Sequence, residues 1–247
     1  MSSRWHENYA RGRPSYPVDA VRVAGLAPSS TVLEVGAGTG KLTSVLVDEF
    51  SQVVAVEPDP HMRPWFTALN PRAALLAGRA EALAVAPASI DAVFVAEAFH
   101  WFDHSRALTE FGRVLRPGGA LVLMWNRPAG RPDPPITAVE RLLEPLWPKD
   151  IAMPLDLDPS RFAYAREWPS AFEDSVFEPL QESTFANTCT VSRDDLVAYF
   201  GSMAWIDALP ENKVLRLLDE VRSRLVDREY RLPFETDAHW ARLAARV

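Results

Sequence analysis

The sequence predicts an α/β fold in which helices cover both faces of a largely parallel sheet. Three observations support this class. Short apolar runs alternate with amphipathic helical segments between residues 31 and 126. Three glycines separate the first apolar run from the helix that follows it. No run of about 18 apolar residues interrupts the pattern. Such alternation is typical of parallel strands joined by crossover helices.

The predicted elements follow one another in the order that a doubly wound sheet requires. A first helix is expected over residues 18–26, between two prolines that act as stop signals. The predicted strands are Thr31–Val35, Gln52–Val56, Ala73–Ala77, Ile90–Ala96 and Ala120–Trp125. The predicted helices between them are Lys41–Phe50, a helix from Asp59 and Pro60 to about Leu69, and His104–Leu115 with Asp103 as its N-cap.

The alternation ends after Asn126. Residues 127–172 are rich in proline, and we expect them to form a cap insertion over the carboxyl edge of the sheet, with one short helix at about Ile136–Leu146. The elements predicted after the cap are a strand at Ser175–Thr190, a helix from Ser192 to about Ser202, an amphipathic helix at Glu211–Val226 packing through Val214, Leu215, Leu218, Val221 and Leu225, and a last strand at Tyr230–Thr236. Pro233 lacks an N–H donor, so this last strand is expected at or near an edge.

We therefore expect a single domain over residues 1–247. Its parts are an N-terminal lid or helix over 1–30, a core over 31–126, the cap insertion over 127–172, and C-terminal strands and helices over 173–247 that complete the sheet.

Charge and cysteine content narrow the function. The chain has 26 basic against 33 acidic residues and a net charge of −7, which disfavours nucleic acid as a partner. One cysteine, Cys189, excludes an intrachain disulfide and a multi-cysteine metal site. Apart from His100, which is discussed below, the histidines are His6, His61, His104 and His239. They lack metal-ligand spacing, so we predict no metal. The amino terminus does not resemble a signal peptide, and we expect a cytoplasmic protein without membrane insertion.

The strongest local motif is the glycine loop that follows Val35. It reads Gly36-Ala37-Gly38-Thr39-Gly40. A phosphate-binding P-loop would need glycine at Val35 and a hydroxyl at Leu42, so that reading fails. A dinucleotide fingerprint would need a third glycine at Lys41, where a long side chain would oppose close helix packing. The pattern that fits is acidic-x-Gly-x-Gly-x-Gly, beginning at Glu34.

This motif and four further blocks resemble the class I S-adenosylmethionine-dependent methyltransferases. The blocks are Val53–Pro58, Gly78–Leu83, Ile90–Phe102 and Val114–Gly119. Most similar is the small-molecule subgroup that includes the trans-aconitate and ubiquinone/menaquinone-biosynthesis methyltransferases. The resemblance implies a Rossmann-like methyltransferase fold, with a mostly parallel seven-stranded sheet and one antiparallel strand near its edge. Arg79 departs from the family pattern, in which an aspartate is common.

The resemblance also implies a cofactor, S-adenosylmethionine, with S-adenosylhomocysteine as its product. Glu57 ends a strand 21 residues after Gly36, where a carboxylate can accept both ribose hydroxyls. Glu34 would orient the loop and face the methionine moiety, Ala80 and Glu81 would flank the adenine, and Ala96 and Glu97 would lie at the methionine end. The remaining predicted cofactor residues are Gly36, Ala37, Gly38, Gly40 and Pro58, with Tyr9 and Arg13 of an N-terminal lid.

The methyl acceptor is expected beyond the fourth strand, at His100 and Trp101. His100 is the candidate catalytic residue, because it could deprotonate a hydroxyl or bind a carboxylate as a cation. The alternative is that His100 bonds its own loop while Trp101 and Phe102 pack in the core. The other candidate acceptor residues are Tyr16, Trp125, Asn126 and Arg127.

The sequence thus predicts a methyltransferase for a small-molecule acceptor, with O-methylation favoured over N- or C-methylation. Arg127, Arg131 or Arg161 would recognise an acidic acceptor. Two alternatives stay open: a non-catalytic protein that keeps the cofactor site, and a nucleic-acid methyltransferase. A monomer and a homodimer are equally compatible with the sequence.

Overall fold

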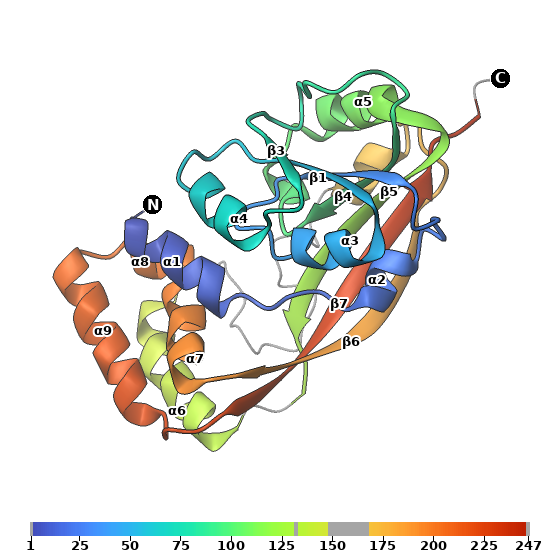
Figure 1. Ribbon diagram of the computed structural model, residues 1–247. Coiled ribbons are helices and arrows are strands. Elements are labelled where there is room, and N and C mark those ends of the chain that lie inside the picture. Colours follow the sequence, from blue (N-terminus) through green and yellow to red (C-terminus); the bar gives the residue numbers. More distant parts are fainter. Residues whose placement is uncertain (1, 131–132, 148–167, 246–247) are drawn as a thin grey trace. The chain divides into compact units, whose positions relative to one another are not determined.

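The chain folds around a seven-stranded sheet with the strand order β3-β2-β1-β4-β5-β7-β6 (Figure 1). A computed structural model describes residues 2–130, 133–147 and 168–245. The strands are β1 Thr31–Val35, β2 Gln52–Val56, β3 Ala74–Leu76, β4 Ile90–Ala96, β5 Leu115–Pro128, β6 Gln181–Val191 and β7 Tyr230–Arg242. This order confirms the predicted fold class.

Strand direction follows the prediction as well. β1 pairs in parallel with β2 and β4, β2 with β3, and β4 with β5. β7 runs antiparallel to β5. This direction follows from two hydrogen bonds at opposite ends of the pair, from Leu243 N to Gly119 O and from Ala129 N to Pro233 O. β7 lies one strand in from the edge and β6 is the edge strand. Pro233 therefore keeps a place near the edge, and its carbonyl is the paired group.

Alternate residues of the central strands build two separate apolar layers. Val93 and Val95 of β4 join a cluster with α5 and the 3-10 helix at Trp168–Phe172, whereas Phe94 and Ala96 join a cluster with α2 and α3. The two-residue period of a strand places these side chains on opposite faces. Helices thus cover both faces of the sheet (Figure 1), and the sheet's carboxyl edge is left for loops.

The helices mostly match their predicted positions. They are α1 Ser3–Gly12, α2 Val18–Arg22, α3 Thr43–Glu49, α4 Arg63–Leu69, α5 His104–Val114, α6 Pro134–Leu143, α7 Arg193–Gly201, α8 Ala204–Asp207 and α9 Glu211–Arg224, with 3-10 turns at Phe99–Trp101, Glu144–Leu146 and Trp168–Phe172. Asp103 and Ser192 cap α5 and α7 as predicted, each accepting a hydrogen bond from the backbone N–H three residues on.

Four expectations needed correction. The helix expected from Asp59 begins at Arg63, because Pro64 lacks an N–H and is tolerated only in a first turn. α1, whose buried residues include Trp5, His6 and Ala10, and the four-residue α8 were not predicted as helices. Along α9 and its C-cap, Val214, Val221 and Leu225 are buried as predicted, but Leu217 is buried where Leu215 was expected and Leu215 is 48 % exposed. The strand predicted at Ala120–Trp125 is the longer β5, Leu115–Pro128, which includes Pro117, Gly118 and Gly119 and whose register to β4 shifts between Ile90 and Ala92.

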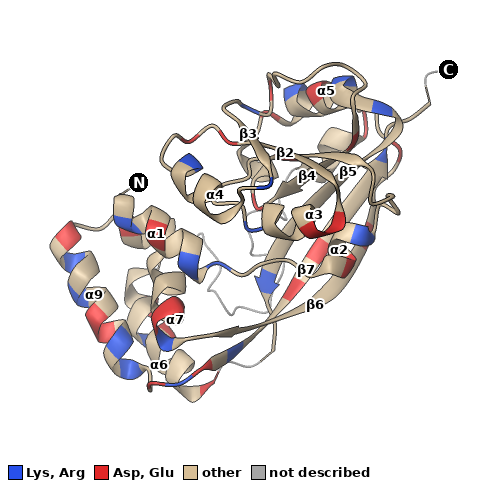
Figure 2. Cartoon of the chain, in the orientation of Figure 1, with Lys and Arg blue, Asp and Glu red and all other residues tan. Residues whose placement is uncertain are grey.

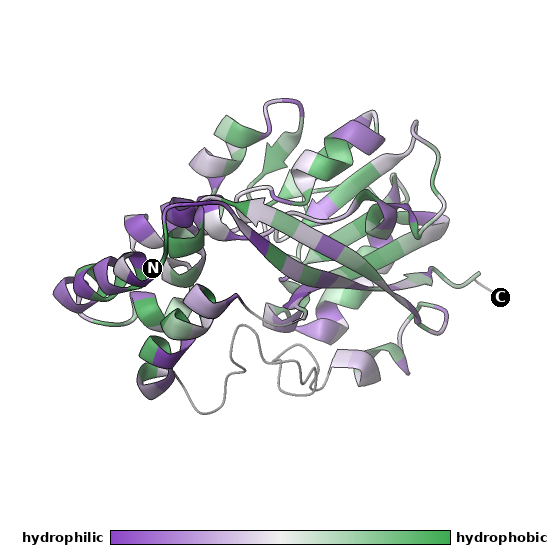
Figure 3. Ribbon diagram, turned by 90° about the horizontal axis from the view of Figure 1, so that it is seen from below, coloured by the Kyte–Doolittle hydropathy of each residue, from purple (hydrophilic) through white to green (hydrophobic). Residues whose placement is uncertain are grey.

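The chain divides into two compact units, each made of separate segments. The sheet unit comprises described residues 15–126, 168–186 and 236–245, and the helical unit comprises described residues 2–14, 127–130, 133–147 and 187–235. β5, β6 and β7 run from the first into the second. The two long strands that cross the front of Figure 3, β6 and β7, mix hydrophilic and hydrophobic residues along their length.

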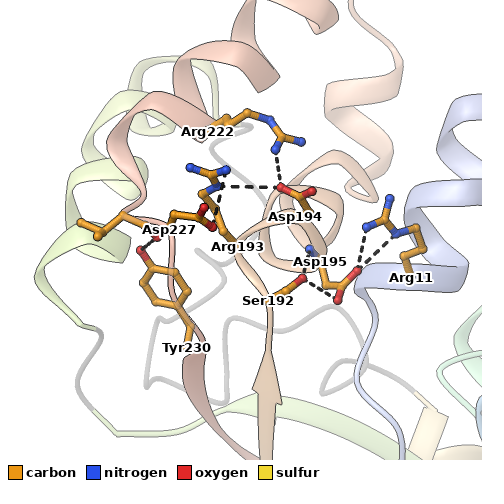
Figure 4. A network of polar contacts seen from close by, with 9 residues as sticks. Arg11, Ser192, Arg193, Asp194, Asp195, Arg222, Asp227 and Tyr230 are labelled. Atoms are coloured by element: carbon orange, nitrogen blue, oxygen red, sulfur yellow. Dashed lines mark hydrogen bonds and ion pairs between the residues drawn. The ribbon is translucent and has the colours of Figure 1, made fainter.

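The helical unit has its own core, formed by α6, α7, α9 and the adjoining ends of β6 and β7. α1 packs on α7 so closely that a Cβ on Gly12 would lie 2.1 Å from Tyr199 N. Ion pairs at the start of α7 join Arg11 to Asp195 and Arg222 to Asp194 (Figure 4). Both acidic and basic residues lie along α9 (Figure 2). Of the helices in the described residues, none is both long and apolar enough to cross a membrane.

Candidate functional site

The glycine loop lies at the carboxyl edge of the sheet, between the end of β1 and the start of α3. Gly36, Gly38 and Gly40 all have positive φ angles, of 76°, 58° and 85°. These backbone conformations favour glycine, as the motif predicted. Gly36 N and Ala37 N both donate to Val56 O, at 2.9 and 3.1 Å. The loop is therefore fastened to the end of β2, where Glu57 and the exposed Pro58 follow.

Glu57 closes the loop from the β2 side. It is 6 % exposed, and its Oε2 accepts a hydrogen bond from Gly38 N at 2.7 Å while its Oε1 accepts one from Asp59 N at 2.7 Å. Burial raises the pKa of the Glu57 carboxyl, and the two backbone donors oppose that rise. Each carboxylate oxygen retains a second lone pair, so Glu57 can accept further hydrogen bonds from a ligand.

Glu34 is a second buried carboxyl beside the loop. It is 2 % exposed, on β1, and accepts a hydrogen bond from the Thr43 hydroxyl at the start of α3. Burial raises the pKa of Glu34 to about 8, the Thr43 hydrogen bond lowers it, and the nearby Glu57 raises it further. Two acidic groups thus lie close together beside a loop in which three of the five residues are glycine.

The far end of the loop is held by Asn70, which the sequence analysis did not identify. Its Nδ2 donates to Gly40 O at 3.2 Å and its Oδ1 accepts from Ser44 Oγ at 2.9 Å. A Cβ on Gly40 would lie 2.1 Å from Asn70 Nδ2. Asn70 follows α4 and belongs to no local motif, so no sequence signal marked it. Thr39 Oγ1, inside the loop, is buried and has no hydrogen-bond partner within the described residues.

The loop after β4, residues 97–102, lies against the glycine loop. A Cβ on Gly36 would come within 2.6 Å of Ala98 Cβ. Glu97 has a positive φ of 51°, and its Oε1 accepts from Asn126 N at 2.7 Å. Glu97 thus joins the ends of β4 and β5, while the buried Ala96 ends β4 beside it. Adjacent parallel strands β1 and β4 therefore bring their two loops into contact.

The loop after β3 carries the predicted adenine-flanking pair. Ala80 is buried among the residues of the α5 layer. Glu81 Oε1 accepts from Asp103 N at 3.0 Å, and its Oε2 lies 3.5 Å from Nε of Arg79. Arg79, which stands where the family commonly has an aspartate, is thus a largely exposed side chain that pairs with Glu81 in the loop after β3.

His100 belongs to a cluster of aromatic rings at the ends of β4 and β5. Its Nδ1 accepts a hydrogen bond from Trp125 Nε1 at 3.4 Å. The Trp125 ring stacks on Trp168, with centroids 5.0 Å apart, and the His239 ring makes T-shaped contacts with both indoles. Burial, and secondarily the charge of His104, lowers the pKa of His100 to about 4. This pKa favours a neutral His100 at pH 7 over the cation that the sequence analysis considered.

The other candidates of the sheet unit are partly engaged. Trp101 is 77 % exposed, so it does not pack in the core. Asn126 Nδ2 donates to Ser15 O at 3.1 Å, and its Oδ1 accepts from the Thr236 hydroxyl. Tyr16 packs against the α2 and α3 layer. The chain at residues 15 and 16 therefore runs beside the end of β5.

Three candidates lie in the helical unit. Arg13 Nε donates to Ser202 Oγ at 2.8 Å, and its guanidinium lies 5.3 Å from the centre of the Tyr9 ring. Arg127 pairs with Glu235 across β5 and β7. Arg131 and Arg161 lie outside the described residues. Among the described residues, no group of three His, Cys, Asp or Glu side chains is placed to hold a metal ion.

Comparison with known proteins agrees with this architecture. A family model described as a methyltransferase domain matches residues 33–123. "Uncharacterized methyltransferase Rv3342" of Mycobacterium tuberculosis is 50% identical over 118 residues, which are 48% of this chain and 49% of that relative, so the match spans about half of its length. "Uncharacterized methyltransferase-like C25B8.10" of Schizosaccharomyces pombe is 32% identical over 224 residues, covering 87% of this chain and 82% of the relative.

A solved structure from Anaeromyxobacter dehalogenans, described as a type II methyltransferase, has the same fold. It superposes with a TM-score of 0.69 at 24% identity, over 95% of this chain and 99% of the other. The strand order, the acidic glycine loop and the relative that spans most of the chain define one class of protein. The chain belongs to the class I S-adenosylmethionine-dependent methyltransferases.

Proposed function

We propose that this protein binds S-adenosylmethionine at the glycine loop and transfers its methyl group to a small-molecule acceptor held beside the loop after β4. The observation that carries the proposal is Glu57. It is a buried carboxyl beyond β2 that is hydrogen-bonded to Gly38 N, 2.7 Å away, with lone pairs left for a ligand.

The residues at the loop fit this cofactor. Positive-φ glycines leave bare backbone that a ligand can approach. Glu57 would accept the ribose hydroxyls, and Glu34 would face the methionine end, where a cationic ligand favours the ionised carboxyl. The buried Thr39 hydroxyl, which has no partner in the described residues, is available as a further donor. Ala80 and Glu81 would flank the adenine, with Ala96 and Glu97 near the reacting methyl group.

The chain's contribution to the reaction is alignment. The bound cofactor supplies an activated methyl group on a sulfonium. The contact between Gly36 and Ala98 brings the cofactor loop next to the loop that carries His100 and Trp101. Holding the acceptor in line beside the methyl group and excluding water supply most of the rate enhancement expected for such a transfer. We propose an oxygen atom as the acceptor. Tyr16, Trp125, Asn126 and Arg127 are further candidates for its surroundings, and Tyr9 and Arg13 for a lid.

Calorimetry with S-adenosylmethionine, S-adenosylhomocysteine and NAD tests the proposal directly. We expect both sulfur ligands to bind, because the loop offers acidic acceptors for hydroxyl and ammonium groups. NAD should not bind, because Lys41 stands where a dinucleotide site needs its third glycine. Tight NAD binding without any response to S-adenosylhomocysteine would refute the assignment. Label transfer from methyl-labelled cofactor to an acceptor library then separates an enzyme from a binding protein.

A further inference from the structure

We propose that Trp125 is a positioning residue that holds His100 in the tautomer with its hydrogen on Nε2, so that His100 offers the methyl acceptor a hydrogen-bond donor and is not its general base. The place of the acceptor rests on the proposed function. The tautomer itself is a property of this chain and can be measured without any acceptor.

The first step is the fixed direction of the Trp125 N–H. Trp125 is 0 % exposed and lies in β5. Its ring stacks on Trp168 at an interplanar angle of 25°, and the His239 ring makes a T-shaped contact with it at 74°. Phe99 in turn meets Trp168 edge to face at 5.9 Å. An indole ring packed on several sides cannot turn its N–H away from His100 without moving these neighbours.

The second step follows from the chemistry of the two nitrogens. An indole nitrogen can donate a hydrogen bond but cannot accept one. The His100 Nδ1 that faces it at 3.4 Å must therefore carry a lone pair. Since burial keeps His100 neutral at pH 7, its single ring hydrogen is on Nε2. The opposite tautomer would place two N–H groups against each other.

The third step concerns the groups that face His100. His104 lies on α5, and its charge would oppose a proton on His100. His239 on β7 faces the same indoles, and burial lowers its pKa too, against the opposing charges of Glu182 and Asp237. Within the described residues, Nε2 of His100 has no hydrogen-bond partner, and the exposed Trp101 ring lies beside it with centroids 4.9 Å apart. Nε2–H is thus the group left for a ligand.

The consequence is a restriction on the acceptor. A base at Nε2 would need a lone pair there, and the only lone pair of neutral His100 points at Trp125. His100 can therefore serve only an acceptor whose reacting atom has no proton for it to remove, such as a carboxylate oxygen. With the cofactor bound, such an oxygen would form a bond to the methyl carbon as the carbon–sulfur bond breaks and its electron pair stays on sulfur. No proton would be released, and His100 Nε2–H would donate a hydrogen bond to the carboxylate.

The test is nitrogen NMR of the full chain labelled with ¹⁵N-histidine, titrated from pH 7.5 downward. The His100 signals are assigned by their loss in His100→Gln. We expect the pattern of a neutral ring with hydrogen on Nε2. In Trp125→Phe we expect mixing of the two tautomers and at least a tenfold rise in the proton affinity of His100, because protonation at Nδ1 no longer meets an N–H.

Trp240→Phe is the matched control, since Trp240 packs against the opposite layer of the same unit. It should leave the His100 signals unchanged. A ring with hydrogen on Nδ1, or a cation at pH 7, in the unsubstituted protein would overturn the proposal even if Trp125→Phe fails to fold. An unchanged tautomer and proton affinity in folded Trp125→Phe would remove the role of Trp125. S-adenosylhomocysteine binding, measured separately, reports on the proposed function alone.

Discussion

The glycine loop and the loop after β4 touch each other, yet they are built on opposite principles. Around Gly36–Gly40, the polar contacts join side chains to backbone: Glu57 accepts from Gly38 N and Asn70 donates to Gly40 O. Around His100, the contacts join ring to ring, and one indole N–H supplies the hydrogen bond. A loop that binds a ligand through its backbone groups requires particular φ and ψ angles. A cluster of packed rings requires only volume and apolar surface.

The largest effect on ligand affinity is expected at Glu57, the side chain that accepts a hydrogen bond from the glycine loop. Glu57→Ala removes an anionic acceptor whose charge-assisted bonds are each worth roughly 1.5–3 kcal/mol. We expect S-adenosylhomocysteine binding to weaken by about 2–4 kcal/mol, on the order of 30- to 1,000-fold in the dissociation constant. Calorimetry measures this. Gly38 N and Asp59 N also lose their partner, so the melting temperature should fall somewhat. Affinity within threefold of the parent in a folded variant would show that Glu57 does not hold the ligand.

The need for glycine in the loop is tested at Gly40, with Gly118 as the matched control. Both have positive φ, 85° and 74°, but only Gly40 has atoms within 4 Å of the point where an alanine methyl would lie, the nearest being Asn70 Nδ2 at 2.1 Å. Strain at positive φ and overpacking each cost about 1–3 kcal/mol. We expect Gly40→Ala to destabilise the protein by about 3 kcal/mol in denaturant titrations and Gly118→Ala by about 1 kcal/mol. Equal losses would mean that the close packing against Asn70 is not required.

These contrasts explain how much the sequence predicted. Three glycines at alternate positions after an apolar strand, with Glu34 before them and Glu57 after the next strand, specify local backbone, so the conformation of the candidate cofactor loop could be predicted from adjacent residues. Asn70 was missed because it acts across 30 residues of chain. The stacking of Trp125, Trp168 and His239 joins three segments that no local pattern links. Sequence periodicity placed the strands, but burial of His100, which removes its charge, depended on that long-range packing.

The buried carboxyl pair predicts a pH effect on the free protein. The pKa of Glu34, about 8, lies above its ordinary value of 4.5, so the folded state binds the proton more tightly than the unfolded state. This stabilisation is fully present below pH 4.5 and is lost as pH rises toward 8. Between about pH 6 and 7.5 we expect a loss on the order of 2 kcal/mol.

Glu34→Gln isolates this effect, because glutamine resembles the protonated carboxyl and does not titrate. Its unfolding free energy should be flatter with pH than that of the parent over the same interval, with Glu57 and the neighbouring Asp59 and Arg63 unchanged. Denaturant titrations at both pH values give the comparison. Parallel pH profiles for parent and variant would mean that Glu34 is ionised in the folded protein.

The smallest effect is expected at Thr39, where the signs of the changes in stability and in ligand affinity are informative. The Thr39 hydroxyl is buried and lacks a partner in the described residues, whereas the Thr43 hydroxyl bonds Glu34. Thr39→Val should therefore leave the free protein as stable or up to about 1 kcal/mol more stable, since an unpaired buried polar group is removed. If the hydroxyl bonds the cofactor, the same change should weaken S-adenosylhomocysteine binding by about 1 kcal/mol, roughly fivefold.

Thr43→Val is the control: it should destabilise the free protein by about 1–3 kcal/mol, because it leaves the Glu34 carboxyl without its donor. Opposite signs for Thr39→Val in stability and affinity would identify a hydroxyl kept for the ligand. A loss of stability without any loss of affinity would assign Thr39 to the fold alone.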